Sequence, residues 1–426
     1  MSGRTDKRVL YSAALGQFVE WYDFVVYAYS ATVIAKLFFP TADPTTALLS
    51  ALAVYGVGFV MRPLGGFIFG SLGDRYGRKA ILAGIILSMG ASTVLIGLLP
   101  TYAQIGIAAP VLLVVLRLIQ GLSAAGETVG SNSFVAEHAP PGRRGLHVAF
   151  TYAFANLPPV VAALLILLLT NLMGDAAYES WGWRIPFILG GPMALVGLYI
   201  RNQVEESPAF RHAQATNEIS SSPVKDAIHG QRKQMAFSFS LAAFSSLAFY
   251  TLSGYFVSYL TASVGLSRSD ALIANSVAMS VAFVAMVLGG HLSDRFGRKP
   301  ILMISLLFNA CISVPAYIMA SHATLPSAIA AQTLLAIGMG MFAGPLGATL
   351  LELFPTKTRF SASAISYNLA YTLFGGTAPF VGAWLVLKTG SLLAPAVYMA
   401  GVSVAVLLVS FWIPETYKRS LTDEAR

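Results

Sequence analysis

The sequence predicts an all-α membrane protein whose twelve transmembrane helices form two pseudo-symmetric six-helix bundles. Three observations predict this fold: a scarcity of charge, a series of apolar runs, and a loop motif that occurs twice. Only 11% of the 426 residues are charged, whereas a soluble protein carries about 25%. So few charges cannot cover a water-soluble surface. The composition therefore excludes an ordinary soluble enzyme, a nucleic-acid-binding protein and a disordered chain.

Apolar runs long enough to cross a bilayer recur along the chain, since a membrane helix needs roughly 20 mostly apolar residues. The first run contains Glu20 and Asp23 and follows a basic tail, so we interpret it as a retained helix rather than a cleaved signal peptide. The predicted spans are 10–35, 47–72, 80–99, 108–135, 146–172, 184–202, 235–262, 268–291, 299–320, 325–351, 361–387 and 391–413.

The longest connection between spans separates the first six from the last six. It covers about residues 203–233 and is rich in charged side chains. We therefore predict an N-terminal six-helix bundle over 1–202, a cytoplasmic linker over 203–233 and a C-terminal six-helix bundle over 234–426.

The basic residues predict how the chain is oriented in the membrane. Of the 27 Lys and Arg residues, 21 fall on one predicted side, four fall on the other, and Arg62 and Arg117 lie within spans. Because cytoplasmic loops carry the excess of Lys and Arg, both termini are predicted to be cytoplasmic. The net charge of +8 thus reflects how the chain is oriented in the membrane. We expect a multi-pass protein of the cell inner membrane, with the lipid bilayer and no nucleic acid as a partner.

A basic loop motif occurs once in each half, at equivalent places. Residues 70–82 read GSLGDRYGRKAIL and residues 290–302 read GHLSDRFGRKPIL, an offset of 220 residues. Positive-inside bias explains the basic residues but not the shared order of Asp, Arg, Gly, Arg and Lys. The repeat predicts a duplicated unit, which is common in transporters whose substrate site lies between the halves.

The repeated G-x-x-x-D-R-x-G-R-K loop resembles the signature of the major facilitator superfamily. Segments at 16–27, 58–66, 117–127, 181–187 and 352–379 resemble its metabolite:proton symporter branch, which includes carriers for citrate, 2-oxoglutarate, shikimate, proline and betaine. The resemblance implies the major facilitator fold and secondary transport. It also implies that the loop residues gate access to the site rather than bind substrate. These gating candidates are Asp74, Arg75, Arg78, Asp294, Arg295 and Arg298.

Charged residues inside the predicted spans are few, and each is a functional candidate because an unpaired charge in hydrocarbon is costly. They lie with polar neighbours on shared helical faces of spans 1 and 4, and midway along span 2. The substrate-binding candidates among them are Arg62, Arg117, Gln120 and Tyr27, and the proton-coupling candidates are Glu20, Asp23 and Glu127.

Arginines at this depth are suited to an anionic substrate, since the planar guanidinium pairs bidentately with a carboxylate and stays charged. We expect one of the two to hold a substrate carboxylate. A partly buried acid can carry the coupled proton, because burial disfavours its charged form. The alternative is that the five charged groups neutralise one another in a buried network that never touches substrate.

The second half offers neutral polar side chains in place of central charges. One interpretation is that they form the neutral wall of the substrate site, and the other is that they only fasten helices together. These candidates are Tyr255 and Tyr259 on span 7, and Tyr367 and Asn368 on span 11.

The function predicted first is proton-coupled uptake of a small organic acid by alternating access. We favour a di- or tricarboxylate such as citrate, because several carboxylates could engage both arginines. One alternative is proton symport of a zwitterion such as proline or betaine, with its cationic end near an acid or near an aromatic ring such as Trp21 or Tyr27. Another is a drug or metabolite exporter of the same fold.

An enzyme is not expected from this sequence. The chain lacks the G-x-x-x-x-G-K-[ST] order of a nucleotide-binding loop, and its spans show no His/Glu metal spacing. The single cysteine, Cys311, excludes an internal disulfide and a Cys-rich metal site. We expect no cofactor and no metal, and a functional monomer whose partners are a small-molecule substrate and protons.

Overall fold

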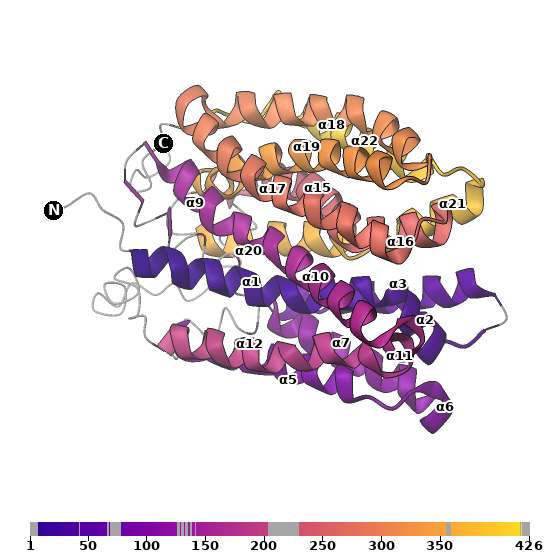
Figure 1. The fold of residues 1–426 in the computed structure, drawn as a ribbon. Coiled ribbons are helices and arrows are strands. Elements are labelled where there is room, and N and C mark those ends of the chain that lie inside the picture. The colour runs from indigo at the N-terminus through magenta and orange to yellow at the C-terminus, as the bar shows by residue number, and fades with distance from the viewer. Residues whose placement is uncertain are drawn as a thin grey trace.

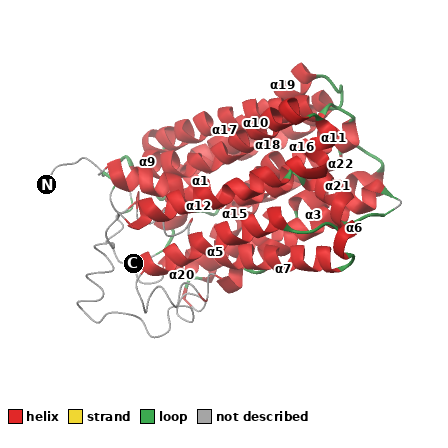
Figure 2. Cartoon of the chain, turned by 60° about the horizontal axis from the view of Figure 1, so that its bottom comes forward, coloured by secondary structure: helices red, strands yellow, loops and turns green. Residues whose placement is uncertain are grey.

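The computed structural model describes residues 7–41, 43–65, 78–125, 142–202, 230–354 and 359–417, together with 68, 128, 132, 135–136, 139–140 and 419. Within these residues the chain forms helices and loops but no strand (Figure 2). Seven of the described helices are long and apolar enough to cross a membrane. Four shorter apolar helices and α1 complete a set that matches the twelve predicted spans. The predicted fold class is confirmed.

The helices of the first half follow the predicted spans in order. Span 5 is a composite of three consecutive helical segments, and short helices lie in the connections. The bounds are α1 Lys7–Tyr29, α2 Ala31–Phe38, α3 Pro44–Val60, α5 Arg78–Leu98, α6 Tyr102–Ile105, α7 Ala108–Ser123, α9 Arg144–Ala153, η1 Phe154–Asn156, α10 Leu157–Met173, α11 Asp175–Ala177, η2 Tyr178–Gly182 and α12 Arg184–Asn202.

The helices of the second half follow the remaining spans. Spans 7 and 11 are composites that contain π-helical turns. The bounds are α15 Arg232–Tyr250, η3 Thr251–Tyr255, α16 Phe256–Ser258, η4 Tyr259–Val264, α17 Arg268–Phe296, α18 Arg298–Ala320, α19 Leu325–Glu352, α20 Arg359–Ala370, η5 Tyr371–Gly375, α21 Ala378–Thr389 and α22 Ala394–Ser410.

Side-chain caps begin several of these helices. Asp43 accepts hydrogen bonds from the backbone N–H groups of Thr45 and Thr46, both at 3.1 Å, and so satisfies donors that have no partner within α3. Hydrogen bonding, first from the Thr46 hydroxyl and then from the Thr45 N–H, lowers the pKa of the Asp43 carboxyl. Ser267 caps α17 in the same way by accepting from the N–H of Asp270 at 3.0 Å.

The two halves lie side by side and touch along several helices. Figure 1 shows α9 and α10 of the first half against α17 of the second half, in agreement with their contacts. On another side of the interface, α3 contacts α21. Residues far apart in the sequence therefore meet between the halves.

Glycines allow the helices to approach closely. A Cβ atom added to Gly121 of α7 would overlap the Gly58 carbonyl of α3, and one added to Gly344 of α19 would overlap the Met286 carbonyl of α17. Small residues at such crossings are typical of membrane bundles, where close packing drives helix association.

Irregular turns interrupt three composite spans. The 3-10 turn η1 precedes Pro158 and Pro159, which occupy the first turn of α10. The π-helical segment η3 follows Tyr250 directly, and η5 begins at Tyr371. π-helical turns are frequent at functional sites, so Tyr250 and Tyr371 are candidate site residues.

Candidate functional site

Glu20 and Arg62 form a buried charged pair next to the second half. Thr128 donates a 2.7 Å hydrogen bond to Glu20 Oε2, and Arg62 Nη2 lies 3.9 Å from Glu20 Oε1. Arg62 is 1% exposed, and its Nε and Nη2 have no hydrogen-bond partner among the described residues. Aromatic rings surround its guanidinium carbon, with centroid distances of 4.6 Å for Phe24, 4.7 Å for Phe59 and 5.7 Å for Trp21.

Arg117 belongs to a second polar group that lies inside the first half. Its Nη1 donates to Gln120 Oε1 at 2.9 Å, and its Nη2 donates to the Tyr55 carbonyl at 3.0 Å. Gln120 Nε2 in turn donates to Thr93 Oγ1 at 2.7 Å. The buried carboxyl of Asp23 lies beside Thr93 and interacts electrostatically with Arg117. The two predicted arginines therefore belong to different polar groups: Arg62 lies next to the second half, and Arg117 lies inside the first.

Aromatic side chains from both halves meet beside the Glu20–Arg62 pair. The Trp21 ring lies 4.7 Å from Phe249, 5.5 Å from Tyr250 and 6.2 Å from Tyr371. Phe59 packs on Tyr250 at 4.9 Å. The Tyr250 hydroxyl is buried and has no hydrogen-bond partner among the described residues. These five residues form an aromatic cluster between the halves.

A group of tyrosine hydroxyls also bridges the interface. Tyr152 of α9 shares a 2.6 Å hydrogen bond with Tyr371 and a 3.4 Å one with Tyr367. The rings of Tyr367 and Tyr371 stack at 3.9 Å. The predicted residue Tyr367 therefore lies at the interface, next to the aromatic cluster.

The other predicted polar residues mainly hold helices together. The Tyr27 hydroxyl donates to the Ala51 carbonyl at 3.0 Å, and that of Tyr259 donates to the Leu392 carbonyl at 3.1 Å. The ring of Tyr255 lies 5.9 Å from that of Tyr259. Asn368 donates at 3.4 Å to the Ala125 carbonyl of the first half, so it does reach across the interface.

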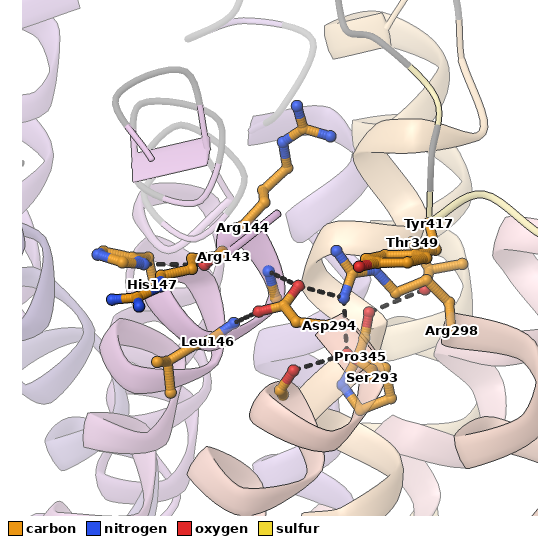
Figure 3. Close-up of polar contacts among 12 residues, drawn as sticks. Arg143, Arg144, Leu146, His147, Ser293, Asp294, Arg298, Pro345, Thr349 and Tyr417 are labelled. Atoms are coloured by element: carbon orange, nitrogen blue, oxygen red, sulfur yellow. Dashed lines mark hydrogen bonds and ion pairs between the residues drawn. The ribbon is translucent and has the colours of Figure 1, made fainter. Parts of the chain in front are cut away.

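The two halves are joined by polar contacts at the end of the molecule where α9 begins and α17 ends, which we call the basic end. Figure 3 shows Asp294 directed from α17 toward the start of α9. Its carboxylate accepts hydrogen bonds from the backbone N–H groups of Gly145 at 2.9 Å and Leu146 at 2.7 Å. A carboxylate at a helix N-terminus is favoured by both the free donors and the helix dipole.

Glu352 extends this network at the basic end. Arg298 donates to Asp294 at 2.7 Å and to both oxygens of Glu352 at 3.3 Å (Figure 3 shows Arg298 beside Asp294). Arg144 of the first half reaches the same carboxylate at 2.9 Å. Arg295, the remaining gating candidate of this loop, is exposed.

The halves also touch at the opposite end, where α3 and α17 begin. The Tyr29 hydroxyl donates to Asn275 Oδ1, and Arg268 Nη2 donates to the Tyr29 carbonyl at 3.2 Å. The Arg268 guanidinium lies 4.8 Å from the Tyr178 ring. Contacts at both ends enclose the central polar and aromatic residues.

Several predicted residues lie outside the described part of the chain. These are Asp74 and Arg75 of the first basic loop and Glu127 of span 4, together with most of the predicted linker. Arg78 is the first residue of α5, but its side chain is not described.

The sequence did not single out every residue that the central region uses. Thr128 shares the face of Arg117 three turns along span 4, so helical spacing could have indicated it. Thr93, Tyr152 and Phe24 have no comparable signal, because a threonine or an aromatic residue within an apolar span is ordinary. Their importance comes from what they contact.

Two known families match the chain, one over each half. Residues 9–229 match the family described as "Sugar (and other) transporter", and residues 238–426 match the "Major Facilitator Superfamily". The glycine betaine/proline/ectoine/pipecolic acid transporter OusA of Dickeya dadantii (strain 3937) is 37% identical, over 97% of this chain and 84% of that protein. The proline/betaine transporter of Escherichia coli (strain K12) is 36% identical, over 97% and 85%.

The fold is also similar to a solved structure of the xylose transporter XylE from E. coli in a partially occluded inward-open conformation. The TM-score is 0.77 at 20% identity, covering 97% of this chain and 99% of that one. The family matches, the relatives and the fold agree with the repeated loop motif. The chain therefore belongs to the major facilitator superfamily and is a multi-pass membrane transporter.

Proposed function

We propose that this transporter is a proton-coupled symporter of a small zwitterion such as proline or glycine betaine. The similarity to the proline/betaine transporters supports this alternative over the di- or tricarboxylate favoured from the sequence. The observation that carries the proposal is the central Arg62, whose buried donors lack hydrogen-bond partners among the described residues and which lies beside aromatic rings and an acid.

Arg62 is the proposed carboxylate-binding residue. Its Nε and Nη2 donors, which have no hydrogen-bond partner among the described residues, have the fork geometry that a carboxylate matches, and they lie next to the aromatic cluster shared by both halves. Arg117, by contrast, uses two of its donors on Gln120 and on the Tyr55 carbonyl within the first half. We therefore assign the substrate role to Arg62 alone.

The balance of charge supports a zwitterion over a polyvalent acid. Arg62 lies beside Glu20, and Arg117 interacts with Asp23, so each cation has its own anion. A tricarboxylate would bring three negative charges into a low-dielectric site with no further described cation to balance them. A zwitterion brings no net charge.

The aromatic cluster supplies a place for the cationic end. A quaternary ammonium group has no N–H donor and is held by aromatic faces, which attract a cation electrostatically. Trp21, Tyr250 and Tyr371 provide such faces from both halves. Binding that engages both halves would favour their closure around the cargo.

The contacts at the two ends support an alternating-access mechanism. We propose that residues 1–202 and 234–426 move as two bundles, that the Asp294 network holds the basic end closed, and that this end faces the cytoplasm. Protons would bind to Glu20 or Asp23, the buried acids of α1. The inward proton gradient would then drive uptake.

The test is a competition assay in proteoliposomes that contain the purified protein. Labelled glycine betaine should accumulate under an inward proton gradient, and a protonophore should abolish the accumulation. Unlabelled proline should compete, whereas citrate at the same concentration should not. Accumulation of citrate, with no effect of proline or betaine, would overturn the proposal.

A further inference from the structure

The Phe24 ring touches both buried arginines. Its centroid lies 4.6 Å from the Arg62 guanidinium carbon and 5.0 Å from that of Arg117. Tyr55 also interacts electrostatically with both arginines, and its ring lies 5.2 Å from the Arg117 guanidinium carbon. Phe24 is fully buried, and it also packs on Phe59 at 5.0 Å and on Tyr55 at 6.4 Å.

The ring lies in the same helix as the acidic partners of the two arginines. Glu20 is one turn before Phe24 in α1 and pairs with Arg62, while Asp23 directly precedes Phe24 and interacts with Arg117. The ionisable groups that interact with Asp23 are Arg117 of α7 and the neighbouring Tyr22 of α1. No cation from the second half is recorded near Asp23 in the described chain.

We propose that Phe24 couples proton binding at Asp23 to cargo binding at Arg62, by keeping water away from both guanidinium groups. This inference rests on the proposed role of Arg62 as the carboxylate site. The Coulomb energy between two charges varies inversely with the local dielectric constant. A buried ring that touches both arginines keeps the dielectric constant low between the two guanidinium groups.

The coupling proceeds through charge alone. When Asp23 binds a proton, the positive charge of Arg117 loses its counter-charge, and the potential at Arg62 becomes more positive. The cargo carboxylate then binds more tightly at Arg62. By thermodynamic linkage, bound cargo favours proton binding at Asp23 by the same factor, and couplings of this kind typically amount to about 5- to 150-fold.

Three variants separate this role from simple packing. Phe24→Ala opens space for water beside both arginines. Phe24→Leu keeps an apolar side chain of similar bulk and continues to exclude water. Phe187→Ala is the matched control, because that ring is fully buried in the same half and packs on Trp183 at 5.8 Å, away from both arginines.

The experiment measures cargo affinity at pH 6 and pH 8, and the number of protons taken up per cargo molecule, in proteoliposomes. The probe is glycine betaine or, if the wild-type vesicles accumulate citrate instead, citrate. If the proposed substrate class is wrong, the wild-type vesicles will accumulate citrate and not betaine. The role of Phe24 can then still be tested with citrate as the probe. Size-exclusion chromatography and cargo counterflow verify that each variant is folded.

The wild-type protein should bind its cargo about tenfold more tightly at the lower pH, within the usual range of such couplings. Phe24→Ala should lose most of this pH dependence and transport fewer protons per cargo molecule while retaining counterflow. Phe24→Leu and Phe187→Ala should keep the wild-type ratio of affinities at the two pH values. Unchanged coupling in Phe24→Ala, or equal loss in Phe24→Leu or Phe187→Ala, would overturn the proposal.

Discussion

Arg144 and Glu352 form an ion pair that joins α9 of the first half to α19 of the second, with 2.9 Å between Nη1 and Oε1. The same carboxylate accepts hydrogen bonds from Arg298 and, at 2.8 Å, from the Thr416 hydroxyl. Because Glu352 is buried and its partners come from both halves, separating the halves at this end leaves a buried charge with fewer partners. The network thus favours a closed basic end.

Asp294→Asn should weaken this closure and leave cargo affinity nearly unchanged. The substitution removes the charge that two N–H groups of α9 and Arg298 share, which is worth about 1.5–3 kcal/mol per hydrogen bond to a charged group. Spin labels on α9 and α18 should show a larger open population at the basic end. Arg295→Gln, an exposed change at the same end of α17, is the control. Abolished cargo binding in well-folded Asp294→Asn would contradict a gating role.

Gly376→Val should prevent the two halves from closing where α3 meets the segment after η5. A Cβ on Gly376 would lie 2.5 Å from the Phe59 Cβ of α3, and one on Gly56 would lie 2.8 Å from the Gly376 carbonyl oxygen, so the two halves pack too closely there for a side chain. Uptake should be lost, and a cysteine introduced into α3 should stay reactive to a membrane-impermeant reagent in a Cys311→Ser background. Gly401→Val is the matched control, since nothing lies within 4 Å of that position. Wild-type uptake by Gly376→Val would refute the contact.

Arg62→Lys and Arg117→Lys should fail in different ways. Lysine keeps the charge but loses the fork, so Arg62→Lys should weaken cargo binding by about 2 kcal/mol or more. Arg117→Lys should instead lower the melting temperature, because the Tyr55 carbonyl and Gln120 each lose a donor. Binding isotherms and thermal unfolding measure the two effects. The assignment is wrong if Arg117→Lys weakens cargo binding and Arg62→Lys only lowers the melting temperature.

Trp21→Leu should reduce glycine betaine affinity, whereas Trp21→Phe should retain most of it. A cation held over an aromatic face gains about 0.5–2 kcal/mol, and leucine supplies no such face. Competition with labelled betaine gives both affinities in one assay. Equal affinity in the two variants would show that the ring does not contact the cationic end.

The sequence determined the spans, their pairing into two repeats and the short list of intramembrane charges. These features are local, since a span is recognised by the length of its apolar run and a repeat by its order of residues. The placement of Asp294 and Arg298 in the repeated motif, apart from the central charges, also came from this local information, although the structure puts Asp294 in α17 and Arg298 at the start of α18.

Only the tertiary structure decided which of the two arginines lies next to the second half. Glu20 and Asp23 share a helical face to a first approximation, yet residues three apart differ by about 60° around the axis. That rotation directs Glu20 toward Arg62 and Asp23 toward Arg117. The position of Phe24 against both guanidinium groups likewise depends on how α1, α3 and α7 pack together, and no pattern within a single helix contains that information.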